Sequence, residues 1–299
     1  MKDNLLHHYC IDGVVFSADP ANPGLYCVAT PIGNLADITL RALKTLASVD
    51  LILCEDTRVT RRLLTHYGIR ARLEVYNDHS PASLREKLIA HLGEGASIAL
   101  VSDAGTPLIS DPGYRLVTAV RKAGHNVFSI PGANAAVSAL STAGLPTDTF
   151  FFTGFLPVKK AARKTRLDEL KHVPATLILY ESPRRLLLTI TDCHDVLGNR
   201  QAAVARELTK AFEETVTGTL LELYEDFAAR DQIKGEIVIL VAPPDEADEE
   251  NVPDLDTVLK DALSHRTLKD AVAEVTKTTG LARKTVYRRA LELRDENSQ

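Results

Sequence analysis

The sequence predicts an α/β protein with two α/β domains and a small C-terminal helical module. Short apolar runs alternate with helical patterns over most of the 299 residues, and helical patterns alone follow an acidic stretch near the end. Loops of glycine, proline and small residues follow apolar runs at Leu25–Asn34, Ser97–Gly113, Val127–Ala136 and Phe150–Pro157. Such loops bring backbone close to a ligand at the carboxyl ends of strands, although glycine and proline also punctuate ordinary loops. We therefore expect these loops to build one ligand-binding cleft.

The first α/β domain is expected at residues 24–145, after an extension of unknown role at residues 1–23. Its strands are predicted at Leu25–Ala29, Leu51–Cys54, Leu73–Val75, Ser97–Val101 and Asn126–Ile130. Its helices are predicted at Leu40–Ala47, Thr57–His66, Ser83–Leu92 and Pro112–Ala123. Alternating strands and helices imply a largely parallel sheet. Helix starts with an N-cap residue followed by proline are predicted at Asp111-Pro112 and Ser182-Pro183.

A second α/β domain is expected at residues 149–243, beyond a linker-like stretch at residues 144–148. Its strands are predicted at Phe150–Thr153, Ala175–Tyr180, Ala202–Arg206 and Gly235–Val241, with helices near Ala161–Lys171, Pro183–Val196 and Leu220–Ala229. The run Phe212–Leu220 is rich in Thr and Val and is expected to add an antiparallel strand. A cleft between two such domains is a usual place for a small-molecule site.

The chain is expected to end in a small helical module at residues 255–295. Its helices are predicted at Leu255–Ser264, Leu268–Thr278 and Ala282–Arg294, with a spacing similar to that of a helix-turn-helix. On the last helix, Val286, Ala290 and Leu291 are expected to face inward. The outward-facing cations that can meet phosphates are Arg283, Lys284, Arg288 and Arg289. A packing module with solvated arginines explains this pattern equally well.

Composition and charge narrow the class of protein. A content of 45% hydrophobic and 25% charged residues is ordinary for a globular protein. No apolar stretch approaches the roughly 18 residues of a membrane span, and a signal-peptide pattern is missing, so we expect a cytoplasmic protein without membrane contact. The four cysteines form no C-x-x-C pair, so no metal is expected. Basic runs at residues 159–166 and 283–289, in a chain of net charge −5, favour a polyanionic partner.

Several nucleotide fingerprints are missing from the sequence. The patterns G-x-x-x-x-G-K-[ST] and, after the first strand, G-x-G-x-x-G are absent, as is the G-x-S-x-G of α/β-hydrolases. These absences favour a cofactor without a polyphosphate, a description that S-adenosylmethionine meets. Its carboxylate suits N–H groups at a loop or helix start, and its sulfonium disfavours adjacent fixed cations. Residues 30–34, 103–110 and 131–135 indeed contain no Lys or Arg.

A set of short strings in the sequence resembles one known family: VATPIGNLADIT, CEDTR, VSDAGTPLISDPG, PGANAA, FTGFLP, YESPRR, ARELTK and KGEIV. They are similar to strings of the bacterial small-subunit (16S) ribosomal RNA cytidine 2′-O-ribose methyltransferases, of the tetrapyrrole-methylase superfamily. The resemblance covers about residues 24–293. It implies two αβα domains, a homodimer and S-adenosylmethionine in the cleft between the domains. It also implies methylation of a cytidine ribose in the decoding region of 16S ribosomal RNA, within the assembled small subunit.

The resemblance further implies which residues hold the cofactor. The matching positions are Pro31, Ile32, Gly33, Gly105, Thr106, Ile109, Ser110, Gly132, Ala133, Phe155, Leu208 and Gly235. One departure concerns a carboxylate. Tetrapyrrole methylases and diphthine synthases usually have Asp in a G-D-P string where this chain has Gly105-Thr106-Pro107. The resemblance therefore does not carry over a carboxylate contact at this position.

A base that takes the proton of a ribose hydroxyl is a further expectation, because the hydroxyl is a poor nucleophile at neutral pH. Glu55 and Asp56, after the second predicted strand, are the leading candidates, followed by Glu207. Two of them have structural alternatives. Asp56 is placed to cap the helix that begins at Thr57, and Glu207 is placed to pair with Lys210.

Recognition of RNA phosphates is expected from a second set of residues: Arg58, Arg61, Arg62, Arg184 and Arg185, together with the cations of the last helix. Surface ion pairs explain the same residues. Two alternative functions remain open at this stage. One is a tetrapyrrole or protein (diphthine-type) methyltransferase, and the other is a non-catalytic RNA-binding or ribosome-assembly protein. The basic runs and the terminal module favour RNA over a tetrapyrrole, because a small tetrapyrrole needs neither.

Overall fold

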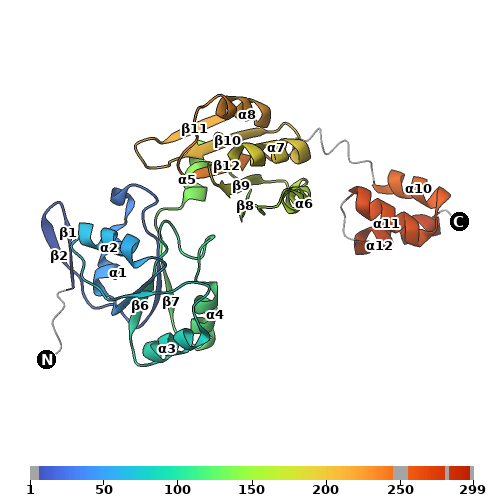
Figure 1. Cartoon of the computed structure of the whole chain (residues 1–299). Helices are drawn as coiled ribbons and strands as arrows, with labels where there is room; N and C mark the ends of the chain where they lie inside the picture. The colour runs from blue at the N-terminus through green and yellow to red at the C-terminus, as the bar shows by residue number, and fades with distance from the viewer. Residues whose placement is uncertain (1–6, 245–254, 280–282, 297–299) are drawn as a thin grey trace. The chain divides into compact units, whose positions relative to one another are not determined.

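A computed structural model describes residues 7–244, 255–279 and 283–296 (Figure 1). Residue contacts divide the chain into two units, residues 1–243 and residues 244–299. In the described residues, the first unit contains two five-stranded β-sheets with helices packed on them and a separate two-stranded sheet, and the second unit is helical. The predicted α/β fold class with a C-terminal helical module is therefore confirmed.

The first sheet is parallel and has the strand order β5-β4-β6-β3-β7. Its strands are β3 (Gly24–Val28), β4 (Leu51–Cys54), β5 (Leu73–Val75), β6 (Ser97–Leu100) and β7 (Val127–Ile130). The connections contain a 3-10 turn, η1 (Leu35–Asp37), and the helices α1 (Leu40–Ser48), α2 (Thr57–His66), α3 (Ala82–Gly93) and α4 (Tyr114–Lys122). Because the strands run in one direction, the loops that follow β3, β4, β6 and β7 leave from the same edge of the sheet.

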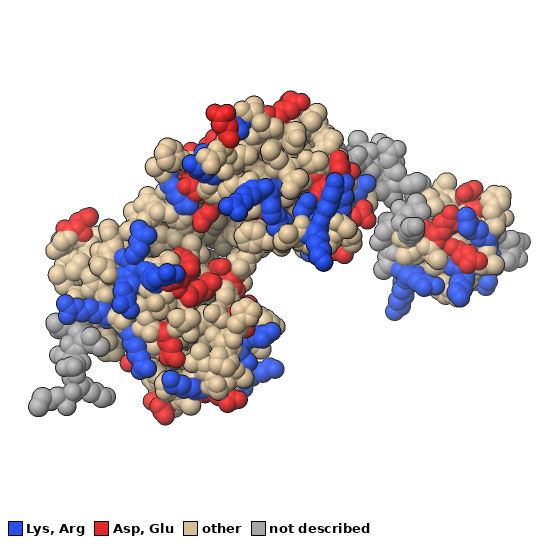
Figure 2. Space-filling view, in the orientation of Figure 1, with Lys and Arg blue, Asp and Glu red and all other residues tan. Residues whose placement is uncertain are grey.

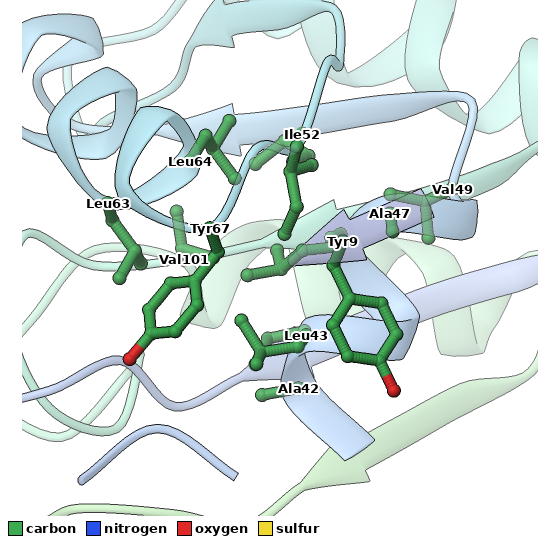
Figure 3. Close-up of a cluster of buried hydrophobic side chains, with 14 of the residues drawn as sticks. Tyr9, Ala42, Leu43, Ala47, Val49, Ile52, Leu63, Leu64, Tyr67 and Val101 are labelled. Carbon is green, nitrogen blue, oxygen red and sulfur yellow. The ribbon is translucent and has the colours of Figure 1, made fainter. Parts of the chain in front are cut away.

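A buried apolar cluster joins this sheet to α1 and α2 (Figure 3). Leu43 on α1, Ile52 on β4 and Leu64 on α2 are at most 3% exposed. The sequence of α1 places apolar residues three or four positions apart, so one face of the helix can be buried against the sheet. This packing fixes the start of α2, and with it the loop that follows β4.

The N-terminal segment forms a hairpin of β1 (His8–Ile11) and β2 (Val14–Ser17). Tyr9 is 8% exposed and belongs to the same apolar cluster (Figure 3). The N–H of Cys10 donates a hydrogen bond of 2.7 Å to the carbonyl oxygen of Tyr67. The described part of the expected extension therefore packs against the core of the first α/β domain.

The second sheet is mixed and has the strand order β11-β10-β12-β9-β8. Its strands are β8 (Phe150–Phe155), β9 (Thr176–Glu181), β10 (Gln201–Arg206), β11 (Glu214–Thr219) and β12 (Ile237–Val241). The helices after them are α6 (Lys160–Leu170), α7 (Leu186–Leu197) and α8 (Leu220–Ala228). β8 and β9 are parallel, whereas β12 is antiparallel to β9 and to β10. The predicted antiparallel strand within residues 212–220 is confirmed as β11.

Helix α5 (Ala135–Thr142) follows a strand of the first sheet but packs on the second. Ala139 and Leu140 form one buried cluster with Ile178 of β9 and Leu240 of β12. The side-chain oxygen of Asn134 caps the helix by accepting hydrogen bonds from the N–H groups of the second and third residues after it. The chain therefore passes from the first sheet to the second in the loop just before α5. This loop lies next to both sheets.

Both predicted helix starts with an N-cap residue and proline are wrong. α4 begins at Tyr114 with Gly113 as its N-cap, and Asp111 lies in the preceding loop. α7 begins at Leu186, after a turn in which the N–H of Arg185 donates to the carbonyl oxygen of Ser182 at 3.0 Å. A proline after a small polar residue suits a β-turn as well as a helix start. At both sites the proline lies in a turn before the helix. At the first site Gly113 has a φ of 130°, which is outside the helical range, so α4 cannot begin before it.

The basic run at residues 159–166 is not uniformly exposed. The side chain of Arg163 is 4% exposed and makes an ion pair of 2.6 Å with Asp192, which is 2% exposed. The Arg163 guanidinium also donates to the carbonyl oxygen of Val158 at 3.0 Å. Arg163 therefore joins α6 to α7. Among the described residues, no cluster of His, Cys, Asp and Glu could hold a metal ion.

The second unit contains α10 (Leu255–His265), α11 (Leu268–Thr279) and α12 (Arg283–Glu296). Val286 and Ala290 are fully buried in its core, as predicted, whereas Leu291 is half-buried and the buried leucine of this helix is Leu293, which is 1% exposed. The sequence also predicts a partial capping box at Thr267 and Asp270, and it is present, because the hydroxyl of Thr267 accepts from the N–H of Asp270 and donates to its carboxylate. The helix stop that the sequence predicts at Gly280 lies outside the described residues. In the part of the chain that the structure covers, no helix is long and apolar enough to span a membrane.

The buried pair between α6 and α7 gives a test of the fold. Asp192→Ala leaves the Arg163 guanidinium buried without its carboxylate, so we expect the free energy of unfolding to fall by about 3–5 kcal/mol. The matched control is Asp195→Ala, which removes a half-exposed carboxylate that pairs with Lys164 at 2.7 Å. This control should change the unfolding free energy by less than about 1 kcal/mol. Urea unfolding measures both, and equal effects would contradict a structural role for Arg163.

Candidate active site

A cavity of about 360 Å³ lies where the ends of the two sheets of the first unit approach each other. The first sheet contributes the loops after β3 and β6, and the segment between β7 and α5. The second sheet contributes the ends of β8, β9 and β10, the start of β12, and the segments next to them. The lining residues are Ile32, Ala104, Gly105, Thr106, Ile109, Ser110, Asp111, Asn134, Ala135, Phe155, Tyr180, Glu181, Ser182, Pro183, Ala205, Leu208, Gly235, Glu236, Ile237 and Val238. A volume in this range accommodates a cofactor-sized molecule.

Hydrogen bonds join the loops of the first sheet to one another. Thr30 and Gly105 exchange two backbone hydrogen bonds of 2.9 and 3.0 Å. The hydroxyl of Thr106 donates to the carbonyl oxygen of Ala133 at 3.1 Å. The loops after β3, β6 and β7 therefore form one surface, although they are far apart in the sequence.

The loop after β6 has an unusual backbone. Besides two glycines, Leu108 and Ser110 have positive φ values of 74° and 64°. Side chains other than glycine rarely adopt this conformation, and it occurs often at functional sites. Ser110 lies against the second sheet at Gly154, where an added Cβ would be 2.7 Å from the Ser110 hydroxyl oxygen. A glycine at position 154 therefore allows the two halves to approach closely.

A second contact between the halves involves the ARELTK string. The N–H of Asn34 donates to the Thr209 hydroxyl at 3.0 Å. Gly33 lies against the Lys210 side chain, where an added Cβ would be 2.5 Å from Cγ. The Lys210 ammonium binds the carboxylates of Glu207 at 2.7 Å and Glu236 at 3.0 Å. The loop after β3 is thus held against the loop after β10, and Ile32 and Leu208 from these loops both line the cavity.

The electrostatics of the cavity are set by carboxylates, because none of its lining residues in the described chain is Lys or Arg. Burial raises the pKa of the Asp111 carboxyl, and the nearby charge of Asp103 adds to the rise. Burial, with the charges of Asp111 and Asp103, also raises the pKa of Glu55. Burial raises the pKa of the Tyr180 phenol, and Asp111 contributes to that shift as well. Several acidic groups therefore share a partly dehydrated region.

The predicted cofactor residues fall into two groups. Those that line the cavity are Ile32, Gly105, Thr106, Ile109, Ser110, Phe155, Leu208 and Gly235. Pro31, Gly33, Gly132 and Ala133 lie beside it and shape the loops. A Cβ at Gly132 would be 3.0 Å from the Cβ of Ala29, so this glycine serves backbone packing.

The predicted catalytic carboxylates differ in their hydrogen-bond and ion-pair partners. The Asp56 carboxylate caps α2 by accepting from the N–H of Arg58 at 2.8 Å, and it also binds the Arg58 guanidinium. These hydrogen bonds lower the pKa of Asp56 to about 2. Glu207 accepts from Lys210 and from the N–H of Glu236 at 3.0 Å, and the Lys210 hydrogen bond lowers its pKa. Both structural alternatives are therefore present, and Glu55 is the one of these candidates whose pKa is raised.

The predicted RNA-binding cations also divide by their contacts. Those with exposed side chains are Arg58, Arg61, Arg62, Arg184, Arg283, Lys284 and Arg288. Arg185 is largely buried and donates to the carbonyl oxygen of Leu156 at 2.9 Å. Arg289 binds Asp256 of α10 and Glu292 of its own helix. Figure 2 shows groups of basic side chains on the displayed face of the first unit, with acidic side chains between them.

The sequence reasoning missed several polar residues of the cavity: Asp111, Asn134, Tyr180, Glu181, Ser182 and Glu236. Tyr180 and Glu181 end the buried strand β9, and polar residues at that position of an α/β sheet are a signal for a site. The sequence pattern predicts Asp111 as a helix N-cap, so Asp111 is not among the predicted site residues. Asn134 caps α5 and lines the cavity as well.

Comparisons with known proteins define the class of protein that has this fold and site. Residues 24–224 match the family model of Tetrapyrrole (Corrin/Porphyrin) Methylases. Residues 249–294 match the model of the RsmI C-terminal HTH domain. A solved diphthine synthase superposes with a TM-score of 0.56 at 14% identity, over 73% of this chain and 89% of that chain. A solved cobalt precorrin-4 methyltransferase superposes with a TM-score of 0.54 at 18% identity, over 73% and 94%. At these identities the two structures show the fold alone.

Curated relatives specify the branch within this class. A protein of Mesorhizobium japonicum named Ribosomal RNA small subunit methyltransferase I is 52% identical over 283 residues, covering 94% of this chain and 96% of its own length. The protein of the same name from Escherichia coli O157:H7 is 48% identical over 283 residues, covering 92% and 97%. This chain belongs to the ribosomal RNA small subunit methyltransferase I family, within the tetrapyrrole methylases. The resemblance inferred from the sequence strings is thereby confirmed.

The ion-pair group around Lys210 predicts a pH-dependent loss of stability. Lys210→Met leaves Glu207 and Glu236 without their cation, so we expect the free energy of unfolding at pH 7 to fall by about 1–2 kcal/mol. Because the pKa of Glu207 is lowered in the folded protein, its stabilisation is present above the unfolded-state pKa and is lost as the pH falls through the folded-state value.

Urea unfolding between pH 7 and pH 3 should therefore show the difference between Lys210→Met and the unmodified protein shrinking on acidification. Lys87→Met is the matched control, because Lys87 is half-exposed and lies 3.8 Å from Glu74. Its effect should stay below about 1 kcal/mol. A difference for Lys210→Met that stays constant down to pH 3 would contradict the role given to this lysine.

Proposed function

We propose that this protein is an S-adenosylmethionine-dependent methyltransferase that methylates the ribose 2′-hydroxyl of a cytidine in the decoding region of 16S ribosomal RNA. The observation that carries the proposal is the cavity between the two sheets, lined by glycine-rich loops and free of Lys and Arg among the described lining residues. Membership of the ribosomal RNA small subunit methyltransferase I family supplies the class of substrate.

The residues around the cavity fit the proposed cofactor. A sulfonium carries a positive charge, which a lining with Asp111, Glu181 and Glu236 and without Lys or Arg favours. Gly235 has no side chain and lines the cavity, so an adenosine can approach the backbone there closely. A solved uroporphyrin-III C-methyltransferase of this fold, from Thermus thermophilus, is described as complexed with S-adenyl homocysteine. When bound, S-adenosylmethionine supplies an electrophilic methyl carbon.

The chain's own contribution to the reaction is largely positioning. Methyl transfer requires the acceptor oxygen, the methyl carbon and the sulfur to lie in line, so holding both reactants rigidly accounts for much of the acceleration. The contacts at Asn34–Thr209 and Ser110–Gly154 keep the two walls of the cavity together.

Exposed cations supply a surface for the RNA. Arg61 and Arg62 on α2 are exposed and follow the loop after β4, and Arg184 is exposed beside the cavity-lining Pro183. Guanidinium groups suit phosphate oxygens. In the second unit, the exposed cations of α12 are Arg283, Lys284 and Arg288.

The alternative functions are not favoured. A tetrapyrrole or diphthine-type protein methyltransferase is suggested by the fold alone, at 14–18% identity. Those functions give no role to a terminal module that matches the RsmI C-terminal HTH domain. A non-catalytic RNA-binding protein gives no role to the cavity. We also propose, from the family resemblance, that the protein is a cytoplasmic homodimer that acts on the assembled small subunit.

Incubation of the full-length protein with labelled S-adenosylmethionine and unmodified small ribosomal subunits tests the proposal. We expect one methyl group per subunit, mapped to a cytidine 2′-oxygen of the decoding region. Gly105→Val is the binding control, because Gly105 has a φ of 78° that disfavours a branched side chain, and it should weaken cofactor binding in calorimetry. Label in a tetrapyrrole or protein acceptor, or no label in any acceptor, would overturn the proposal.

The exposed face of α12 gives a second test. Replacing Arg283, Lys284 and Arg288 together by Ala should weaken RNA binding and reduce the slope of log affinity against log salt by about 0.7–0.9 for each lost phosphate contact. The charge-matched control replaces Lys260, Arg266 and Lys269, which are exposed on α10 and α11 or between them. Filter binding at several salt concentrations measures both triple variants. Equal losses would show that net charge, and not this face, attracts the RNA.

A further inference from the structure

The three carboxylates that line the cavity are not equivalent. Glu181 is fully engaged, because its carboxylate accepts from the N–H of Ser182 at 2.8 Å and from the hydroxyl of Thr189 at 2.6 Å, and pairs with Arg185 at 3.2 Å. Glu236 pairs with Lys210 at 3.0 Å. Both carboxylates therefore have a cation as an ion-pair partner.

Asp111 differs from both. In the described part of the chain it has no Lys or Arg ion-pair partner, and the nearby Ser102 hydroxyl lowers the pKa of Asp111 by less than burial raises it. The side chain is half-buried and lines the cavity directly. Asp111 also follows Ser110, a non-glycine residue at positive φ, in the strained loop after β6. Strain of this kind is retained where a side chain must point in a particular direction.

The groups that face Asp111 come from three places in the first unit. Asp103 lies in the same loop, Glu55 follows β4, and Tyr180 ends β9. Glu181 and Glu236 share the cavity. These neighbours are acids, and burial together with the charge of Asp103 holds the pKa of Asp111 above its usual range. A carboxylate in such surroundings is a stronger base than an exposed one.

We propose that Asp111 is the catalytic base, which accepts the proton of the acceptor hydroxyl during methyl transfer. The inference rests on the proposed function above. As the bond between the hydroxyl oxygen and the methyl carbon forms, the bond between that carbon and the sulfonium sulfur breaks, and its electron pair stays on sulfur. The hydroxyl proton moves to a carboxylate oxygen of Asp111, which releases it to solvent after the product leaves.

This assignment differs from the carboxylates that the sequence singled out. The Asp56 carboxylate caps α2, and the Glu207 carboxylate forms an ion pair with Lys210. Glu55 has a raised pKa but does not line the cavity. The charge of Asp111 contributes to the raised pKa of Glu55, so Glu55 is a neighbour of the proposed base and lies outside the cavity lining.

Asp111→Asn is the test, with labelled S-adenosylmethionine and small ribosomal subunits as substrates. We expect kcat to fall by about 10²- to 10⁴-fold. Cofactor affinity in calorimetry and KM for the subunit should change far less than kcat, since the amide keeps the shape of the side chain while it removes the charge and the basicity. Asp111→Glu keeps a carboxylate and should retain more activity than Asp111→Asn. A thermal unfolding curve for each variant separates loss of chemistry from loss of folding.

Asp103→Asn is the matched control, because it removes a neighbouring negative charge while its amide oxygen can still accept from the N–H of Asp56. In the unmodified protein, kcat should fall on acidification through the pKa of Asp111, which lies above the ordinary value of about 3.9. Asp103→Asn should move this acid limb to lower pH and leave the plateau within about twofold. The limb should be missing in Asp111→Asn.

Two results would overturn the assignment to Asp111. One is a kcat of Asp111→Asn within about tenfold of the unmodified protein. The other is a loss that appears only as weaker cofactor binding or a raised KM, which would make Asp111 a binding residue. Either result, obtained while the unmodified protein methylates the cytidine, leaves the proposed function intact. Failure of the unmodified protein to methylate any subunit would instead overturn the proposed function, and this inference with it.

Discussion

The close contact between two loops from different sheets, Gly33–Asn34 and Thr209–Lys210, is the constraint on which the rest of the site depends. The backbone can approach the Lys210 side chain because position 33 has no Cβ, and the Thr209 hydroxyl then reaches the N–H of Asn34. Ile32 and Leu208, the neighbours of these residues, both line the cavity and belong to one buried apolar cluster. Without this approach the two sheets would each present a separate surface.

The role of each acidic side chain near the cavity depends on whether it has a Lys or Arg ion-pair partner. Lys210 and Arg185 neutralise Glu207, Glu236 and Glu181, which therefore serve as parts of the scaffold. Asp111 is surrounded by acids and has a raised pKa. The pKa of Glu207 is lowered and that of Asp111 is raised, because a nearby cation favours the charged form and burial beside another acid disfavours it.

The basic residues divide in the same way. Arg163, Arg185 and Arg289 are held by carboxylates or carbonyl oxygens and join elements of the fold. Arg61 and Arg62 are exposed on α2. A run of cations in a sequence therefore mixes structural groups with groups that are free to meet phosphates, and burial separates the two kinds.

The sequence by itself determined the elements, the fold class, the glycine-rich loops and the family, because periodicity, turn residues and short strings are local properties. It also indicated the partners of Asp56 and Glu207, since those contacts lie within a few residues. Only the tertiary structure decided that α5 covers the second sheet, that Asp111 faces the cavity and that Arg163 is buried. Each of these depends on residues far apart in the chain, whose distances no local pattern records.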